Sequence, residues 1–206
     1  PITQLTAAGL LLVVNPSSPP KNLKEFVEWT RNFKGALNFG SAGIGSGGHL
    51  AGELYNLMAG VKAQHIPYKG TGPALIDLMA GQYHYNFTGL TGGTTLMRAG
   101  KLRGIAVTMP KRVAAFPDIP AVAEALPGFE IVGWYGVIGP AKLPKPIGTR
   151  LHDEFVKVLK QRDIHERILE VGAEPVGSSP EQFRKFLHAD VAKWAKIVKE
   201  SGAKLN

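Results

Sequence analysis

Cysteine is absent from this sequence of 206 residues, which excludes a disulfide framework and a thiolate metal site. The longest apolar run, Leu10 to Val14, is far too short to span a bilayer, since a membrane helix needs about 20 apolar residues. No basic segment and no long apolar segment follow Pro1, so we expect no signal peptide within this sequence. The histidines never fall in ligand spacing such as His-x-x-x-His, so we expect no metal site.

Positive charge is in excess but is not concentrated. The formal net charge is +8 at pH 7. Residues 1–141 carry 11 Lys and Arg against 7 Asp and Glu, and residues 142–206 carry 13 against 9, so each part contributes +4. No basic run stands out that would follow a phosphate backbone. The sequence therefore predicts a mildly cationic surface and no nucleic-acid partner.

Glycine is plentiful, and much of it lies in three turns, at 39–49, 68–73 and 88–95. Each turn follows a short apolar strand and precedes a helix. Such a turn directs unpaired backbone N–H groups and the positive end of a helix dipole toward one place, which suits an anion. A glycine run also serves tight packing between helix and sheet without any ligand. Three such turns at one edge of a sheet favour an anion-binding site.

The apolar pattern predicts a repeated order of strand and helix. Strands are expected at 10–14, 36–39, 63–68, 82–87 and 102–108. Helices are expected after an N-cap at Asn22, after the first glycine-rich turn up to Gly60, from Pro73 to Gly81, and over 94–99. This order predicts an α/β fold with a mostly parallel sheet and helices on both faces. A strand at 134–140 and a helical segment from Pro146 onward complete the chain.

The spacing Gly43-x-Gly45-x-x-Gly48 satisfies the dinucleotide fingerprint and lies between a strand and a helix. The acidic residue that binds the ribose is missing, because the next strand closes on 65–69 without Asp or Glu. Lys69 could serve a 2′-phosphate, which leaves an NADP-dependent enzyme open as the alternative. Otherwise we expect no cofactor.

Other catalytic motifs are absent from the same turn. A P-loop requires lysine after its last glycine, but His49 follows Gly48. Neither Ser41 nor Ser46 follows a glycine by two positions, which excludes a nucleophile elbow. His49, third in the helix if Ser46 is its cap, either faces a ligand or closes the turn. No helix-turn-helix is present that would accompany the ligand-sensing domain of a transcription regulator.

Six blocks of sequence, in this order, closely resemble the solute receptors of tripartite tricarboxylate transporters, the Bug family. They are FGSAGIGSGGHLAGELYNLMAG, HIPYKGTGPALIDLMAGQ, AGKLRGIAVT, FPDIPAVAEALPGFE, WYGVIGPAKLPKPI and GAEPVGSSPEQF. The resemblance covers nearly the whole chain. It implies a periplasmic, non-catalytic receptor of the type II binding-protein (Venus-flytrap) architecture. Two α/β lobes would close over a small carboxylate, a di- or tricarboxylate or an aromatic acid, and deliver it to a membrane permease.

The resemblance also assigns regions and residues. It makes 10–133 the second lobe of the family, and 134–206 the hinge strand and C-terminal helices of the first lobe. The family's ligand loops match this sequence at Ser41, Gly43, Gly45 and Ser46 and at the turn from Tyr68 to Thr71.

The sequence departs from the family pattern in two ways. Pro1 matches the middle of a family member, so we expect the N-terminal part of the first lobe to be missing or supplied by a second chain. Thr88 stands where family members commonly place Asp, which removes a negative charge and disfavours an amino group on the ligand. A dicarboxylate or an aromatic acid is then easier to accept, with Tyr135 as an apolar wall with a polar tip.

Overall fold

The structure is a computed structural model that describes residues 1–201. The last five positions of the predicted region 134–206, namely 202–206, lie outside the described residues. The strands are β1 (Thr3–Val14), β2 (Asn38–Ser41), β3 (Gln64–Pro67), β4 (Tyr85–Gly89), β5 (Arg103–Val107), β6 (Val132–Val137) and β7 (Ala173–Pro175). The helices are α1 (Leu23–Arg31), α2 (Gly47–Ala59), α3 (Thr71–Met79), α4 (Leu90–Arg98), α5 (Lys145–Leu159), α6 (Arg162–Glu170) and α7 (Pro180–Ser201), with a short 3-10 turn at Val122–Glu124.

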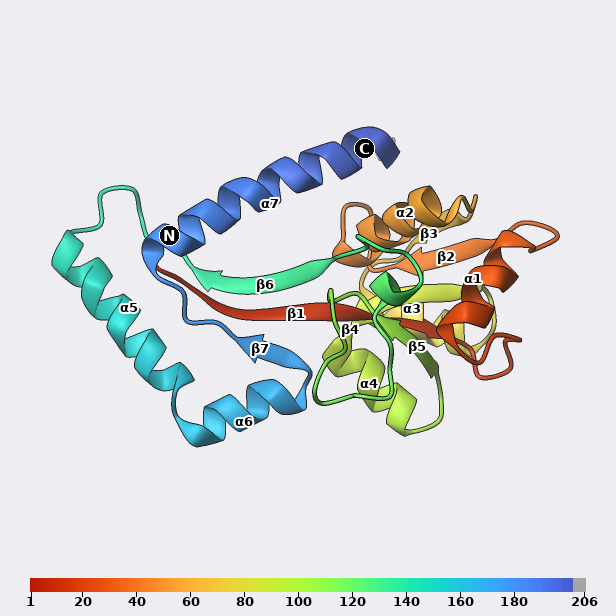
Figure 1. The fold of residues 1–206 in the computed structure, drawn as a ribbon, viewed down its shortest axis with the longest axis horizontal. Helices are drawn as coiled ribbons and strands as arrows, with labels where there is room; N and C mark the ends of the chain where they lie inside the picture. Colours follow the sequence, from red (N-terminus) through yellow and green to blue (C-terminus); the bar gives the residue numbers. More distant parts are fainter. Residues whose placement is uncertain (202–206) are drawn as a thin grey trace.

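Strand β1 is the longest strand and belongs to both halves of the molecule (Figure 1). Its second half, from Leu10, pairs with β4 on one side and β5 on the other. Its first half, up to Gly9, pairs with β6 and, over Thr6 to Ala8, with β7. The predicted strand at 10–14 is therefore the second half of a strand that continues into a neighbouring group of strands.

The main group of strands has the order β3-β2-β4-β1-β5. Strands β2, β3 and β4 are mutually parallel, and β1 runs antiparallel to β4 and β5. Four of these five strands consequently point the same way, as a mostly parallel sheet requires, and β1 alone runs against them. The α/β class predicted from the repeated strand and helix order is confirmed.

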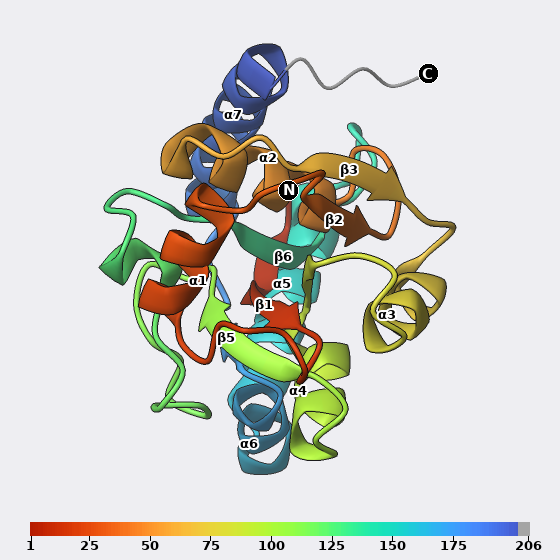
Figure 2. The ribbon, with the colours of Figure 1, turned by 90° about the vertical axis from the view of Figure 1, so that its right-hand side faces the viewer.

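Each face of this sheet is covered by helices. Side chains of a strand alternate between the two faces, so a strand that is apolar throughout needs a partner layer on both sides. In β1, Leu12 and Val14 pack with α1 and α2, whereas Leu11 and Val13 pack with α3 and α4. Figure 2 shows these two pairs of helices on opposite sides of the strands. Leu57 of α2, which helical spacing would place in the core, is 54% exposed, and Tyr55 is buried instead.

Several helix starts follow from local chemistry. Asn22 caps α1 as predicted, since its Oδ1 accepts from the N–H of Glu25 at 3.0 Å. Helix α2 ends at Gly60 in the left-handed conformation, with φ of +68°. Helix α3 begins at Thr71 rather than Pro73, and α4 begins at Leu90 rather than at 94. In α4 the burial of Leu90 outweighs the low helix propensity of two glycines.

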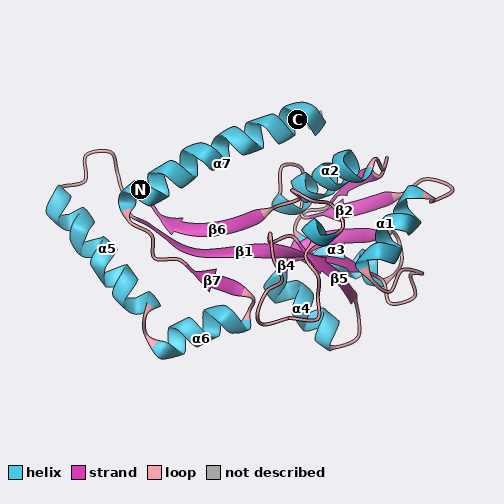
Figure 3. Cartoon of the chain, in the orientation of Figure 1, coloured by secondary structure: helices cyan, strands magenta, loops and turns pink. Residues whose placement is uncertain are grey.

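The chain after β6 is largely helical, with β7 as an additional short strand (Figure 3). Helix α7 lies along β6, where Phe183 packs under Gly136 and the ring of Trp134 contacts Phe183 edge-on. Trp134 Nε1 also donates to Asp190 Oδ2 at 2.9 Å. Within residues 1–201, none of the helices has the length and apolar character that crossing a membrane requires.

Candidate binding site

The turn from β2 to α2 is held by its own side chains. Ser41 is fully buried, and its Oγ donates to the Gly43 carbonyl at 3.0 Å and accepts from the Gly43 N–H at 3.1 Å. His65 Nε2 lies 2.7 Å from the same oxygen. Because the hydroxyl proton already serves the carbonyl, the neutral His65 ring donates from Nε2. Ser41 therefore supports the turn, and its hydroxyl is fully engaged there.

His49 closes the same turn from within α2. Its Nδ1 accepts from the N–H of Gly45 at 3.0 Å, and the residue is only 5% exposed. Gly43 and Gly45 have φ of +134° and +78°, conformations that favour glycine. Burial lowers the pKa of His49, and burial followed by the neighbouring His49 lowers the pKa of His65 to about 4. Both rings are thus neutral near pH 7.

The turn from β3 to α3 is joined to the first turn by backbone hydrogen bonds. The N–H of Tyr68 donates to Ser41 O at 3.0 Å, and that of Gly70 donates to Ala42 O at 3.1 Å. The Tyr68 hydroxyl donates to Asp77 Oδ2 at 2.9 Å. These bonds bring the beginnings of α2 and α3 to the same edge of the sheet, as the three glycine-rich turns predict.

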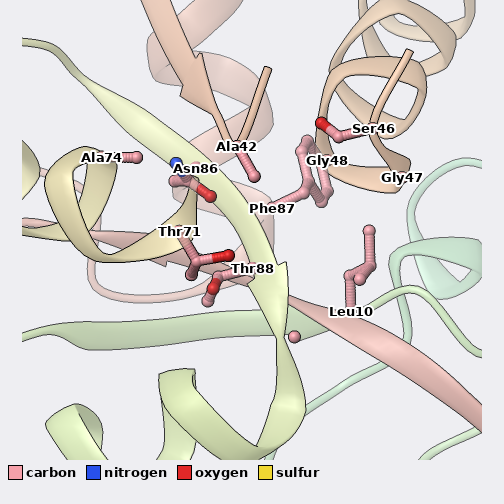
Figure 4. Close-up of a pocket in the computed structure, with 11 residues that line it drawn as sticks. Leu10, Ala42, Ser46, Gly47, Gly48, Thr71, Ala74, Asn86, Phe87 and Thr88 are labelled. Carbon is pink, nitrogen blue, oxygen red and sulfur yellow. The ribbon is translucent and has the colours of Figure 1, made fainter. Parts of the chain in front are cut away.

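A pocket of about 160 Å³ lies where the three glycine-rich turns meet (Figure 4). It is lined by Leu10, Ala42, Ser46, Gly47, Gly48, Thr71, Ala74, Asn86, Phe87, Thr88 and Gly89. Of the residues predicted for the site, Ser46, Thr71 and Thr88 line this pocket. The others, Ser41, Gly43, Gly45, His49, Tyr68 and Tyr135, do not line it. Their roles as ligand contacts stay predictions.

Backbone donors stand on one side of the pocket. The first N–H groups of a helix lack intrahelical acceptors. In α2, Ser46 Oγ accepts from His49 N at 3.3 Å, whereas the N–H groups of Gly47 and Gly48 find no acceptor in the described residues. In α3, Gly70 provides no side-chain cap, and the N–H of Thr71 also finds no acceptor in the described residues. The positive ends of two helices thus contribute to one pocket.

Two polar side chains of β4 stand on another side of the pocket. Thr88 is 3% exposed, and its Oγ1 is buried without a hydrogen-bond partner among the described residues. Asn86 is also 3% exposed and was not among the residues predicted for the site. Because strand residues two apart share a face, Asn86 and Thr88 point the same way. The sequence signal that could have indicated Asn86 is its position two residues before Thr88, on the same face of the predicted strand.

A second hollow of about 460 Å³ adjoins this pocket. The two share Leu10 and Gly89, and the second also lies against β6, α6 and the beginning of α4. Tyr135, 74% exposed, lines this second hollow. Tyr135 therefore stands beside the pocket rather than in it, and its role as an aromatic wall stays a prediction.

The residues that line the pocket offer backbone N–H groups, hydroxyls and one carboxamide, without a charged side chain. Its volume is below the range of about 300 to 1,000 Å³ usual for whole-ligand sites, so it suits one end of a small molecule. Among residues 1–201, no group of three His, Asp or Glu side chains is placed to hold a metal ion.

Comparisons with known proteins agree on one family. The family described as "Tripartite tricarboxylate transporter family receptor" matches residues 1–203. The protein BugT of Bordetella pertussis is 31% identical over 206 residues, which are 100% of this chain and 63% of BugT. The match thus covers about three fifths of the length of BugT and of a second curated relative, from Pseudomonas sp. strain P51.

Solved structures agree in fold as well as in sequence. The R. palustris protein Rpa4515, solved with adipate, superposes with a TM-score of 0.90 at 33% identity, covering 98% of this chain and 68% of that one. MatC of Rhodopseudomonas palustris, solved with bound malate, has a TM-score of 0.81 at 30% identity, covering 96% and 69%. The binding-protein architecture expected from the sequence is therefore confirmed.

Proposed function

The chain belongs to the tripartite tricarboxylate transporter receptor family, and from this premise we propose that it is the ligand-binding part of a periplasmic receptor for a small carboxylate. The receptor captures the acid and delivers it to the membrane permease of a tripartite transporter. It carries out no chemistry on the acid. This proposal concerns the whole protein, of which the chain spans the matched part.

The pocket at the beginnings of α2 and α3 carries this proposal. Gly47, Gly48 and Thr71 line it, and their N–H groups have no acceptor in the described residues. Charge-assisted hydrogen bonds from such groups contribute about 1.5 to 3 kcal/mol each. The dipoles of the two helices add about 0.3 to 1 kcal/mol each. A carboxylate fits these donors without an arginine or lysine. Relatives solved with adipate and with malate support the choice of acids as ligands.

Transport by such a receptor requires a movement that the permease recognises. We propose that 10–133 and 134–206 are the moving parts and that a bound acid shifts the population toward a closed form. Strand β1 connects the two parts, together with β6. The second hollow, which touches both parts, gives the acid a route to bridge them.

An NADP-dependent enzyme is the less favoured of the two candidate functions. The strand before α3 ends at Pro67 without an acidic residue, and the pocket is small for a dinucleotide. Its lining also includes no Asp, Glu, His or Lys that could act as an acid or a base.

Isothermal titration of the full-length protein tests the proposal. Succinate, adipate, malate, benzoate and NADP are titrated separately at pH 7.5. We expect at least one acid to bind with a micromolar or lower Kd and NADP not to bind. Binding of NADP with no response to any acid would overturn the receptor proposal.

A further inference from the structure

The orientation of the Asn86 carboxamide is determined by its neighbours. Tyr83 donates its only hydroxyl proton to the Ala74 carbonyl at 2.6 Å. The Tyr83 oxygen lies 2.9 Å from Asn86 Nδ2 and must accept there. The carboxamide nitrogen is therefore turned toward Tyr83, and Oδ1 is directed the other way. In Figure 4 the nitrogen lies on the side of Ala74 and the oxygen on the side of Thr71 and Thr88.

Asn86 Oδ1 is consequently an acceptor in the pocket that no donor in the described residues serves. The neighbouring Thr88 Oγ1 is buried and unpartnered. Leaving a buried polar atom unpaired costs about 1 to 3 kcal/mol, so Thr88 Oγ1 indicates that a ligand completes this strand face. Asn86 Oδ1 lies on the same face and lines the pocket, where a ligand can reach it. An acceptor requires a donor, and a carboxylate provides none.

The donor on the ligand is neutral rather than cationic. No Asp or Glu lines the pocket, and the positive ends of α2 and α3 are directed at it. An ammonium group would meet this positive potential without a carboxylate to pair with. A hydroxyl group, by contrast, donates to Asn86 Oδ1 and carries no charge.

We propose that this pocket selects hydroxy acids. The ligand's carboxylate binds the N–H groups of α2 and α3, and its hydroxyl group donates to Asn86 Oδ1, with Thr88 Oγ1 as a second partner. The inference rests on the proposed carboxylate receptor function and narrows its ligand class. Oδ1 faces the ligand because the Tyr83 hydroxyl accepts from the carboxamide nitrogen and so fixes the orientation of the Asn86 side chain.

Matched pairs of acids test the inference in the full-length protein. Titrations compare malate with succinate and glycolate with acetate, which differ by one hydroxyl group. We expect the hydroxy acid of at least one pair to bind about tenfold more tightly, the effect of one well-formed hydrogen bond. Aspartate, with ammonium in place of the hydroxyl of malate, should bind more weakly than malate.

The variant Asn86→Leu removes the acceptor at nearly constant volume. We expect its preference for hydroxy acids to fall to about onefold, with the binding of succinate or acetate retained. Asn32→Leu, at the exposed end of α1, is the matched control and should keep the wild-type preference. If Asn86→Leu does not fold, Asn86→Asp serves instead and should weaken every acid while favouring aspartate over malate.

The outcomes separate this inference from the receptor proposal. Equal binding of both acids in each pair overturns the hydroxy-acid inference and leaves a carboxylate receptor. A preference that persists in Asn86→Leu overturns the role of Asn86. If no acid binds and NADP does, the receptor proposal fails, and the inference fails with it.

Discussion

The imidazole rings of His49 and His65 are stacked, with their centroids 3.9 Å apart and their planes within 18°. His49 accepts from the Gly45 N–H, and His65 contacts the Ser41 hydroxyl, so each ring holds one part of the β2–α2 turn. Glu53 lies 3.7 Å from His49 Nε2, and burial raises the pKa of its carboxyl. The turn that brings α2 to the pocket thus depends on two neutral rings.

Stability should fall as the pH is lowered through the range of these histidines. The pKa of His65 is 6.5 when unfolded and about 4 when folded, so between these values the unfolded chain binds more protons. The free energy of unfolding is unaffected above about pH 7 and decreases as the pH falls toward 4. One pKa unit corresponds to about 1.4 kcal/mol, and solvent screening reduces the full shift, so we expect a loss of about 1 to 2 kcal/mol.

Urea denaturation at pH 7.5 and pH 5 measures this loss. His188→Gln, an exposed histidine on α7, should lose as much as the wild type. His65→Gln should lose less, because it removes the group that titrates. Equal pH dependence in all three proteins would contradict the role of the stacked pair.

Thr88→Val should separate stability from binding. The substitution keeps the shape of the side chain and removes a buried hydroxyl that has no partner in the described residues. We expect the ligand-free protein to become more stable by about 1 kcal/mol, as measured by denaturation. The affinity for the bound acid should decrease several-fold. A loss of stability without change in affinity would indicate that Thr88 serves the fold alone.

Gly48→Ala should be strongly destabilising. A Cβ on Gly48 would lie 2.5 Å from the Phe87 carbonyl oxygen, which is backbone and cannot move aside freely. We expect a loss of about 1 to 3 kcal/mol and a displaced α2. Gly92→Ala is the matched control, because its Cβ would meet open space within α4 and should raise stability by up to about 1 kcal/mol. Thermal unfolding of both variants measures the difference.

Ser46→Ala should lower both stability and affinity. Ser46 caps α2 through its bond to the His49 N–H and lines the pocket. Removing such a cap costs about 1 kcal/mol, and the affinity for the acid should fall by about 1 to 2 kcal/mol. Asn22→Ala removes the equivalent cap of α1, away from the pocket, and should cost similar stability with unchanged affinity. Titration and denaturation of both variants distinguish a ligand contact from a cap.

The position of the site could be predicted from the sequence better than the side chains that form it. Glycine-rich turns after strands identify the correct edge of the sheet, because parallel strands place their ends together. Ser41 lies in the richest turn, yet its hydroxyl is used by Gly43 and by His65, a residue of the next strand. Sequence spacing does not reveal that pairing, which depends on the parallel alignment of β2 with β3.

Asn86 illustrates the opposite case. Its position beside Thr88 on a strand was visible in the sequence, but its role follows from the hydroxyl of Tyr83 and the Ala74 carbonyl. These groups meet only after α3 packs against the sheet. The early start of α4 was missed for a similar reason, since the burial of Leu90 is a tertiary effect that opposes local propensity.

One continuous strand, β1, supplies backbone hydrogen bonds to β4 and β5 and also to β6 and β7. Unfolding of either group of strands therefore removes hydrogen-bond partners from the other group. The two halves therefore share a single cooperative unfolding unit. A protease cut in β1 near Gly9, or separate expression of the two halves, would leave both without the strand that each needs to fold.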